Sequence, residues 1–282
     1  MRSTDLMTVV DSHIGLRPSP ESAFDRYLQR KGSLFGFDSD VEAIRWLDSK
    51  QIDRGILLHG DLEKRLDAIR KYPSRLSAFL PVNLRQATES WESTKAMMAY
   101  AVDHGCIGIG TLYTYRENIP LNHAIIAKIA GFACERKLPI HIECSAPVGL
   151  AAPLRTIVPP YLIEALATAF PDLVLILSSY GGGMFLYELM PEIPPRFNRV
   201  FYDTASPVDN WNHKDILKAA SKITRSERLI YGSGAPLKPL SPEFEMSIEV
   251  PTEVKRRIMG ANIRRLFAEC GRSLDGATQS AA

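Results

Sequence analysis

The sequence contains no long apolar segment, no closely spaced pair of cysteines and almost no net charge. No run of about 18 apolar residues occurs, so no membrane-spanning helix is predicted. The four cysteines form no C-x-x-C pair and show no regular spacing, which is typical of the buried, reduced thiols of a cytosolic protein. With a net charge of +2 and basic residues scattered among acids, neither nucleic acid nor an acidic membrane is a predicted partner. We therefore expect a soluble, cytoplasmic protein.

A glycine-rich phosphate turn is also missing. An open, doubly wound α/β sheet would normally carry such a turn after its first strand, but the chain reads Asp11-Ser12-His13-Ile14-Gly15 there. This absence disfavours the open sheet, which is the second-best interpretation of the strand and helix pattern.

Short apolar runs alternate with longer segments in which apolar residues recur at steps of three and four. Eight strands, each followed by a helix, indicate a closed parallel barrel of the TIM (β/α)8 type, and 282 residues are enough for one such domain of about 250. We expect the barrel to occupy residues 1–270 and the small, polar tail 271–282 to be disordered. The expected strands are Leu6–Val10, Gly55–Leu58, Leu76–Pro81, Ile107–Thr111, Leu138–Ile142, Leu173–Leu177, Val200–Tyr202 and Leu229–Tyr231.

Six blocks of sequence, in order, resemble the amidohydrolase-related family, which includes metal-dependent decarboxylases, hydratases and lactonases. This resemblance implies the same barrel fold and a site at the C-terminal ends of the strands. The blocks are VVDSHIGL from Val9, LPIHIECS from Leu138, FPDLVLILSSYGGG from Phe170, VFYDTAS from Val200, LIYGSGAP from Leu229 and IMGANIRRLF from Ile258.

The resemblance also implies a set of metal ligands, from which this chain departs. His13 matches the first histidine of strand one. The other positions, where the family has three histidines and an aspartate, hold Gly15, Glu143, Ser179 and Gly234. A catalytic zinc needs about three protein ligands and an open position for water, and one histidine cannot supply them. The aspartate replaced by Gly234 is also the proton shuttle in the family. We therefore predict neither a bound metal nor another cofactor.

Several polar residues remain at the expected ends of the strands. Glu143, His13 and Asp11 are the candidate catalytic groups, because apolar walls can raise the pKa of an enclosed carboxyl group towards neutrality. Side chains two apart on a strand share a face, which predicts that Asp11 and His13 point inward together. Asp203 is expected to be a structural hydrogen-bonding residue, and His141 is either a core histidine or a substrate contact. The candidate substrate-binding residues are His59, His141, Tyr113, Tyr180 and Ser179.

Three functions stay open at this point. The first is a metal-independent hydrolase of the lactonase kind, or a lyase, acting on a small carbonyl or carboxylate compound. The second is a non-catalytic relative that binds a small molecule or serves as the partner subunit of an active homologue. The third is a metal-dependent hydrolase whose altered ligands include Asp11, His13, His59 and Glu143. The expected partners are a small-molecule ligand and either further copies of the chain or an active homologue.

Overall fold

Eight parallel strands form one sheet in which each strand pairs with the next along the chain. The computed structural model describes residues 7–18, 36–144, 158–205, 212–236, 239 and 241–274. Of the tail expected at 271–282, residues 275–282 lie outside the described ranges. The strands are β1 (Val10–Gly15), β2 (Arg54–His59), β3 (Leu76–Leu80), β4 (Gly108–Leu112), β5 (Ile140–Ile142), β6 (Leu175–Leu177), β7 (Val200–Asp203) and β8 (Leu229–Ile230).

The sheet closes between β8 and β1, so the predicted barrel is confirmed. Ile14 forms a parallel bridge with Ala235. The amide of Ser12 donates to the carbonyl of Tyr231 at 2.9 Å, and the amide of Gly234 donates to the carbonyl of His13 at 3.0 Å. These bonds join the first strand to the chain that follows the last one.

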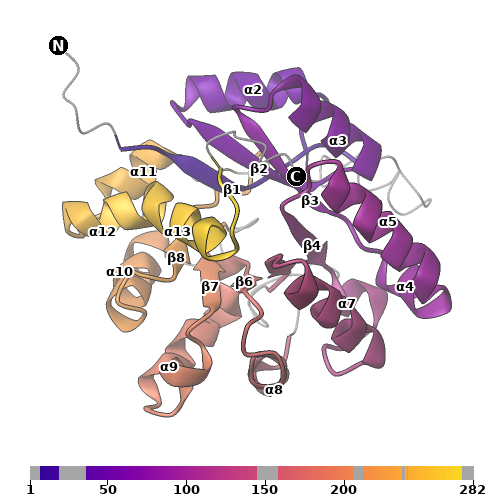
Figure 1. Cartoon of the computed structure of the whole chain (residues 1–282). Helices are drawn as coiled ribbons and strands as arrows, with labels where there is room; N and C mark the ends of the chain where they lie inside the picture. The colour runs from indigo at the N-terminus through magenta and orange to yellow at the C-terminus, as the bar shows by residue number, and fades with distance from the viewer. Residues whose placement is uncertain are drawn as a thin grey trace.

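Helices surround the strands (Figure 1). None of those in the described parts of the chain combines the length and the apolar character needed to span a bilayer. They are α2 (Asp40–Ser49), α3 (Leu62–Lys71), α4 (Leu84–Glu89), α5 (Trp91–Asp103), α6 (Thr114–Glu117), α7 (Ala124–Glu135), α8 (Pro160–Ala169), the 3-10 segment η1 (Ser179–Leu189), α9 (Ile193–Arg196), α10 (His213–Ile223), α11 (Pro242–Ser247), α12 (Thr252–Arg256), the π-helical turn η2 (Arg257–Ala261) and α13 (Asn262–Glu269).

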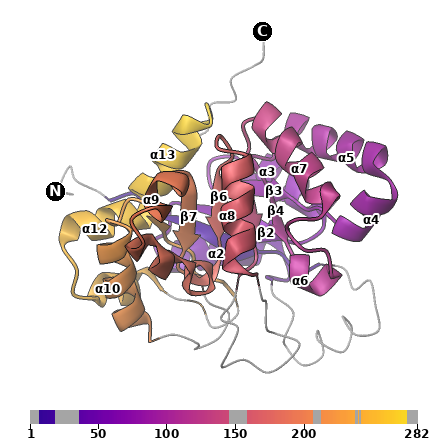
Figure 2. The same cartoon turned by 90° about the horizontal axis from the view of Figure 1, so that it is seen from below.

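The barrel interior is apolar at one end, where α13 closes it. One cluster of buried side chains joins Val10, Phe79 and other strand residues to Leu266 and Phe267 of α13. The rings of Phe79 and Phe267 meet edge to face, with centroids 6.2 Å apart. Truncating such a buried phenylalanine costs about 3–5 kcal/mol of stability. In Figure 2, α13 lies at the top of the barrel and α6, which follows β4, lies at the bottom. The apolar plug therefore leaves the C-terminal ends of the strands for the functional site.

The first strand lies further along the chain than predicted. We expected Leu6–Val10, but β1 spans Val10–Gly15 and includes three polar residues. Two of them bond to the chain after β8: Ser12 Oγ donates to the Tyr231 carbonyl at 2.7 Å, and Asp11 Oδ1 accepts from the Ser233 amide at 2.9 Å. The third, His13, bonds through its ring to Asp203 and His59. A prediction based only on a continuous run of apolar residues therefore placed this strand too early in the sequence.

An irregularity in β1 decides which of its side chains face the site. The pairing register with β2 shifts between Asp11 and Ile14. Val10 packs in the interior cluster with α13, whereas Ile14 packs in the cluster shared with the surrounding helices. Strict alternation would have placed these two side chains on one face. The stretch that contains the shift includes Ser12 and His13, so alternation alone does not fix the direction of the His13 side chain relative to Asp11.

Candidate active site

A polar cavity lies where the strands end. Its volume is about 380 Å³, including the part open to solvent. Its wall draws on β1, β2, α6 and the residues that follow β4, β5, β7 and β8, which is the usual place for an active site in this fold. The lining residues are His13, His59, Tyr113, Arg116, Glu143, Ala205 and Gly234.

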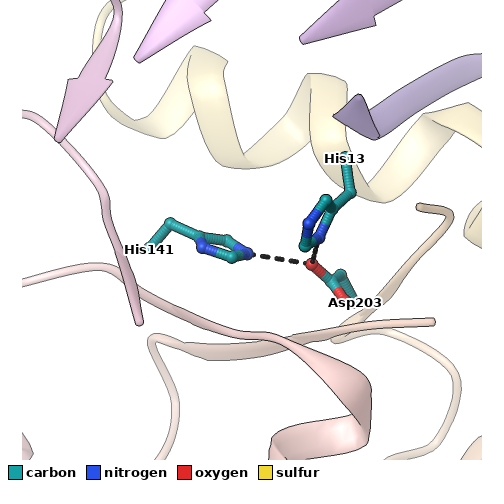
Figure 3. A group of neighbouring side chains, drawn as sticks. All are labelled: His13, His141 and Asp203. Atoms are coloured by element: carbon teal, nitrogen blue, oxygen red, sulfur yellow. Dashed lines mark hydrogen bonds and ion pairs between the residues drawn. The ribbon is translucent and has the colours of Figure 1, made fainter. Parts of the chain in front are cut away.

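Asp203, the last residue of β7, organises the histidines. Its Oδ2 atom accepts hydrogen bonds from Nδ1 of His13 and Nε2 of His141, each at 2.9 Å. Figure 3 shows the two rings, which belong to β1 and β5, aimed at this one oxygen. Oδ1 accepts from the amides of Ser179 and Ala205 at 3.1 Å. With four donors the carboxylate is fully satisfied, as its complete burial requires.

These contacts set the charges in the cluster. Burial would raise the pKa of Asp203, but the charge of His13 and the bonds from both histidines outweigh it and lower that pKa to about 2. Burial also opposes protonation of His13, yet the Asp203 carboxylate prevails and raises the pKa of His13. For His141, burial prevails over Asp203 and lowers the pKa. Of the two histidines bonded to Asp203, His13 is therefore the one whose protonated form the site favours.

The hydrogen-bonded chain continues from His13 across the cavity. Nε2 of His13 lies 3.1 Å from Nε2 of His59, and Nδ1 of His59 lies 2.6 Å from the hydroxyl of Tyr113. Burial, together with the neighbouring charge of His13, lowers the pKa of His59 well below its usual range. A neutral His59 that accepts from His13 must carry its proton on Nδ1 and donate it to the Tyr113 oxygen. The hydroxyl proton of Tyr113 is then free to be donated to a ligand.

His59 occupies the space in front of Gly15. These residues are register partners on β1 and β2. A Cβ atom added at Gly15 would lie 2.6 Å from Cβ of His59, closer than real side chains approach. The resemblance places a histidine at position 15, and here a histidine of the neighbouring strand fills that space.

Glu143 and Arg116 complete the wall. Glu143 follows β5 and is only 7% exposed. Arg116 lies on α6 with its guanidinium carbon 4.5 Å from the centre of the Tyr113 ring. Sequence reasoning identified Glu143 but missed Arg116, because an arginine just beyond a strand looks like any surface charge until the fold places it.

Four predicted site residues do not line the cavity. Asp11 is fully buried and holds the amides of His13 and Ser233. His141 is 1% exposed, and its Nδ1 lies 3.0 Å from the hydroxyl of Thr111. The Ser179 hydroxyl donates to the Ala205 carbonyl at 2.8 Å. Tyr180 is fully buried, and its ring contacts Phe185 and His213.

The backbone at the end of β6 explains why Ser179 and Tyr180 do not line the cavity. Val174 and Ile176 face the barrel interior, so regular alternation would aim position 179 away from it. Ser179 and Tyr180 then adopt left-handed backbone angles, with φ of 52° and 56°. The resemblance supplied these positions, but this local geometry turns both side chains into the protein.

The side chains at the implied ligand positions do not fit the family's metal site. Gly15 and Gly234 offer no donor atom, and the Ser179 hydroxyl is already bonded. Within the described ranges, only His13, His141 and Asp203 bring three candidate ligand atoms within 4.8 Å of one another. His141 and Asp203 are not part of the cavity wall.

Comparison with known proteins adds a family and a set of similar folds. The model of the family described as amidohydrolase matches residues 53–268. No curated protein matches the chain.

Solved structures similar in fold include three enzymes. A 5-carboxyvanillate decarboxylase from Sphingomonas paucimobilis is 13% identical, with a TM-score of 0.71, and 93% of this chain and 99% of that one are covered. A dihydroxybenzoic acid decarboxylase from Polaromonas sp. JS666, solved with bound manganese and the inhibitor 2-nitroresorcinol, is 13% identical, with a TM-score of 0.70 and coverage of 95% and 98%. A probable 2-pyrone-4,6-dicarboxylic acid hydrolase from Acinetobacter baumannii, with citric acid bound, is 16% identical, with a TM-score of 0.67 and coverage of 93% and 100%.

Proposed function

Because the chain belongs to the amidohydrolase family, we propose that it is a hydrolase of the lactonase kind, or a lyase, that acts on a small carbonyl or carboxylate compound without a catalytic metal. One observation carries this proposal. Asp203, His13, His59 and Tyr113 form an unbroken hydrogen-bonded chain that ends in a cavity containing Glu143. Acid–base groups of the protein thus gather where the family places its chemistry. Both reaction classes occur among the similar folds.

Hydrolysis needs a base for water and a donor for the developing oxyanion. In this proposal Glu143 removes a proton from a water molecule as the water oxygen bonds to the carbonyl carbon of the substrate. The carbonyl oxygen becomes an oxyanion and accepts the hydroxyl hydrogen bond of Tyr113. Burial raises the pKa of Tyr113 to about 12, so the hydroxyl keeps its proton and remains a donor.

The intermediate then collapses, and the bond between the carbonyl carbon and the ring or ester oxygen breaks. The leaving oxygen takes the proton that Glu143 removed from water, so the base is restored and the atoms balance. Asp203 and His13 hold His59 in the tautomer that donates to Tyr113, which fixes the direction of the hydroxyl. These two residues act through their neighbours as positioning residues.

A screen of small lactones and carboxylate esters, with purified protein in the presence of a chelator, tests the proposal. Tyr113→Phe is the informative variant, because it removes the donor and keeps the ring. Tyr115→Phe is the matched control, since Tyr115 lies in a separate groove beside α8. We expect turnover to fall about 10²- to 10³-fold in Tyr113→Phe and to be unchanged in Tyr115→Phe. Equal turnover in both variants would contradict the role of Tyr113, and absence of turnover throughout the screen would favour a small-molecule binder.

A further inference from the structure

A second, larger hollow lies between α6 and the start of α8. Its volume is about 810 Å³, including the part open to solvent. One side is formed by α6 and the chain that follows it to residue 122, and the other by residues 158 and 159 with the first turn of α8. Among the described residues, none lines both this groove and the candidate active site. The groove is therefore a separate surface, and an inference about it does not depend on the proposed function.

The lining of this groove is uncharged and largely apolar. No described residue in it is an acid, a base or a histidine, although 23% of the chain is charged. Ile119, Leu121 and Leu162 are at most 8% exposed and supply its apolar surface. Tyr115 of α6 and Tyr161 of α8 are 46% and 67% exposed, so each side presents an aromatic ring to solvent. Such a surface favours a neutral ligand whose apolar groups pack against aromatic rings.

The polar groups of the groove are free to donate hydrogen bonds. Tyr115 and Tyr161 contribute hydroxyls to its lining. Asn118 and Asn122 contribute amides. Within the described ranges, no hydrogen bond uses any of these side-chain groups. A hydroxyl offers one donor and an amide offers two, so a ligand that presents carbonyl oxygens finds partners here. A ligand covered with its own hydroxyl or N–H groups would lose hydration against the apolar side chains without finding enough acceptors.

We propose that the groove between α6 and α8 is a docking site for a proline-rich segment of a partner protein in the polyproline II conformation. Such a segment has no internal hydrogen bonds, so its carbonyl oxygens are open to donors, and its prolines carry no N–H group that needs an acceptor. Its rings are apolar and pack well in grooves lined by aromatic side chains. Because the conformation is already formed in the free peptide, little ordering entropy opposes binding. The neutral lining, the two exposed tyrosines and the free donors match these properties together.

Fluorescence anisotropy of labelled peptides titrated with the full chain tests the proposal. The probes are a polyproline peptide and a Gly-Ser peptide of the same length and charge, because both are neutral and only the first forms the polyproline II helix. Tyr161→Ala removes one aromatic ring from the groove, and Tyr161→Phe removes only the hydroxyl. Tyr187→Ala is the matched control, since Tyr187 of η1 is a tyrosine of similar exposure, 44%, that does not line the groove.

We expect saturable binding of polyproline by the wild type and none of the Gly-Ser peptide. Tyr161→Ala should weaken polyproline binding about 10-fold or more, because aromatic side chains at the centre of an interface contribute most of its affinity. Tyr161→Phe should lose about 3-fold, since it keeps the ring and gives up one hydrogen bond. Tyr187→Ala should bind as the wild type does. Circular dichroism verifies folding, which is expected because the side chains of Tyr161 and Tyr187 are exposed.

Several results would overturn the assignment. They are no saturable binding of polyproline, equal binding of the Gly-Ser peptide, wild-type affinity in folded Tyr161→Ala, or an equal loss in Tyr187→Ala. A neutral oligosaccharide that binds in a manner sensitive to Tyr161→Ala, while polyproline does not bind, would overturn it in favour of a sugar site.

Discussion

The side chain of His59 fills the space that any side chain at Gly15 would need. Its Cβ lies 2.6 Å from the position of a Cβ at residue 15, and its Nε2 lies 3.1 Å from Nε2 of His13. Two histidines therefore still meet at the end of β1, but they come from neighbouring strands. Their Nε2 atoms share this hydrogen bond. Nδ1 of His13 bonds to Asp203, and Nδ1 of His59 bonds to the hydroxyl of Tyr113, so the far side of each ring is also held.

Gly15→Ala should expose this relationship as a loss of stability. The new methyl group collides with a Cβ atom, which cannot swing away as the end of a flexible chain could, and overpacking of this kind costs about 1–3 kcal/mol. In a His59→Gly background the collision is absent, so the same substitution should cost much less. Urea unfolding of the four proteins gives the coupling energy directly. Equal costs in both backgrounds would show that residues 15 and 59 do not share this space.

Asp203→Asn should destabilise the protein above pH 4 and shift the titration of His13. The pKa of Asp203 is lowered from 3.8 to about 2 in the fold, so its ionised form contributes stability that is present above pH 4 and is lost as pH falls towards 2. This contribution is on the order of 2 kcal/mol. The variant should lack this pH dependence, and the pKa of His13, followed by NMR of the imidazole, should fall. An unchanged His13 titration would contradict the pairing.

Asp11 should have the opposite pH dependence. Burial raises its pKa from 3.8 to about 6, so the folded state favours the protonated carboxyl group. The associated stability is fully present below pH 3.8 and is lost as pH rises through 6. The difference between wild type and Asp11→Asn should therefore change by about 2 kcal/mol between pH 4 and pH 7, in favour of the variant at the higher pH. Urea unfolding at both pH values measures this double difference, which cancels any constant cost of the amide. If the stability difference between the two proteins does not change with pH, the pKa of Asp11 is not raised in the fold.

The fold could be predicted from the sequence because the patterns typical of its strands and helices recur eight times along the chain. Eight apolar runs separated by amphipathic segments admit few arrangements, and an error in one run, such as the early placement of strand one, leaves the barrel intact. The cavity was predictable in part for a similar reason. His59 ends a strand, Tyr113 and Glu143 follow strands, and His13 lies two residues before the end of β1. The ends of parallel barrel strands meet.

Side-chain direction was harder to predict because it depends on single local irregularities. The pairing register of β1 shifts between Asp11 and Ile14. Ser179 and Tyr180 adopt left-handed backbone angles, and their side chains are buried outside the cavity wall. The place of Arg116 in the cavity wall was also hard to predict, because it depends on stacking against Tyr113, three positions earlier. Neither periodicity nor motif matching contains these facts.

The central claim is that the side chains of this cavity catalyse without a metal, and one paired measurement tests it most directly. Metal content by elemental analysis and turnover of the best lactone or ester should be determined on the same sample, before and after treatment with a chelator, for the wild type and Glu143→Gln. The account predicts well under one equivalent of zinc, manganese or iron, unchanged wild-type turnover after chelation, and a loss of about 10²-fold or more in folded Glu143→Gln. Turnover that disappears with the chelator and returns on addition of zinc or manganese, or full turnover in Glu143→Gln, would contradict it.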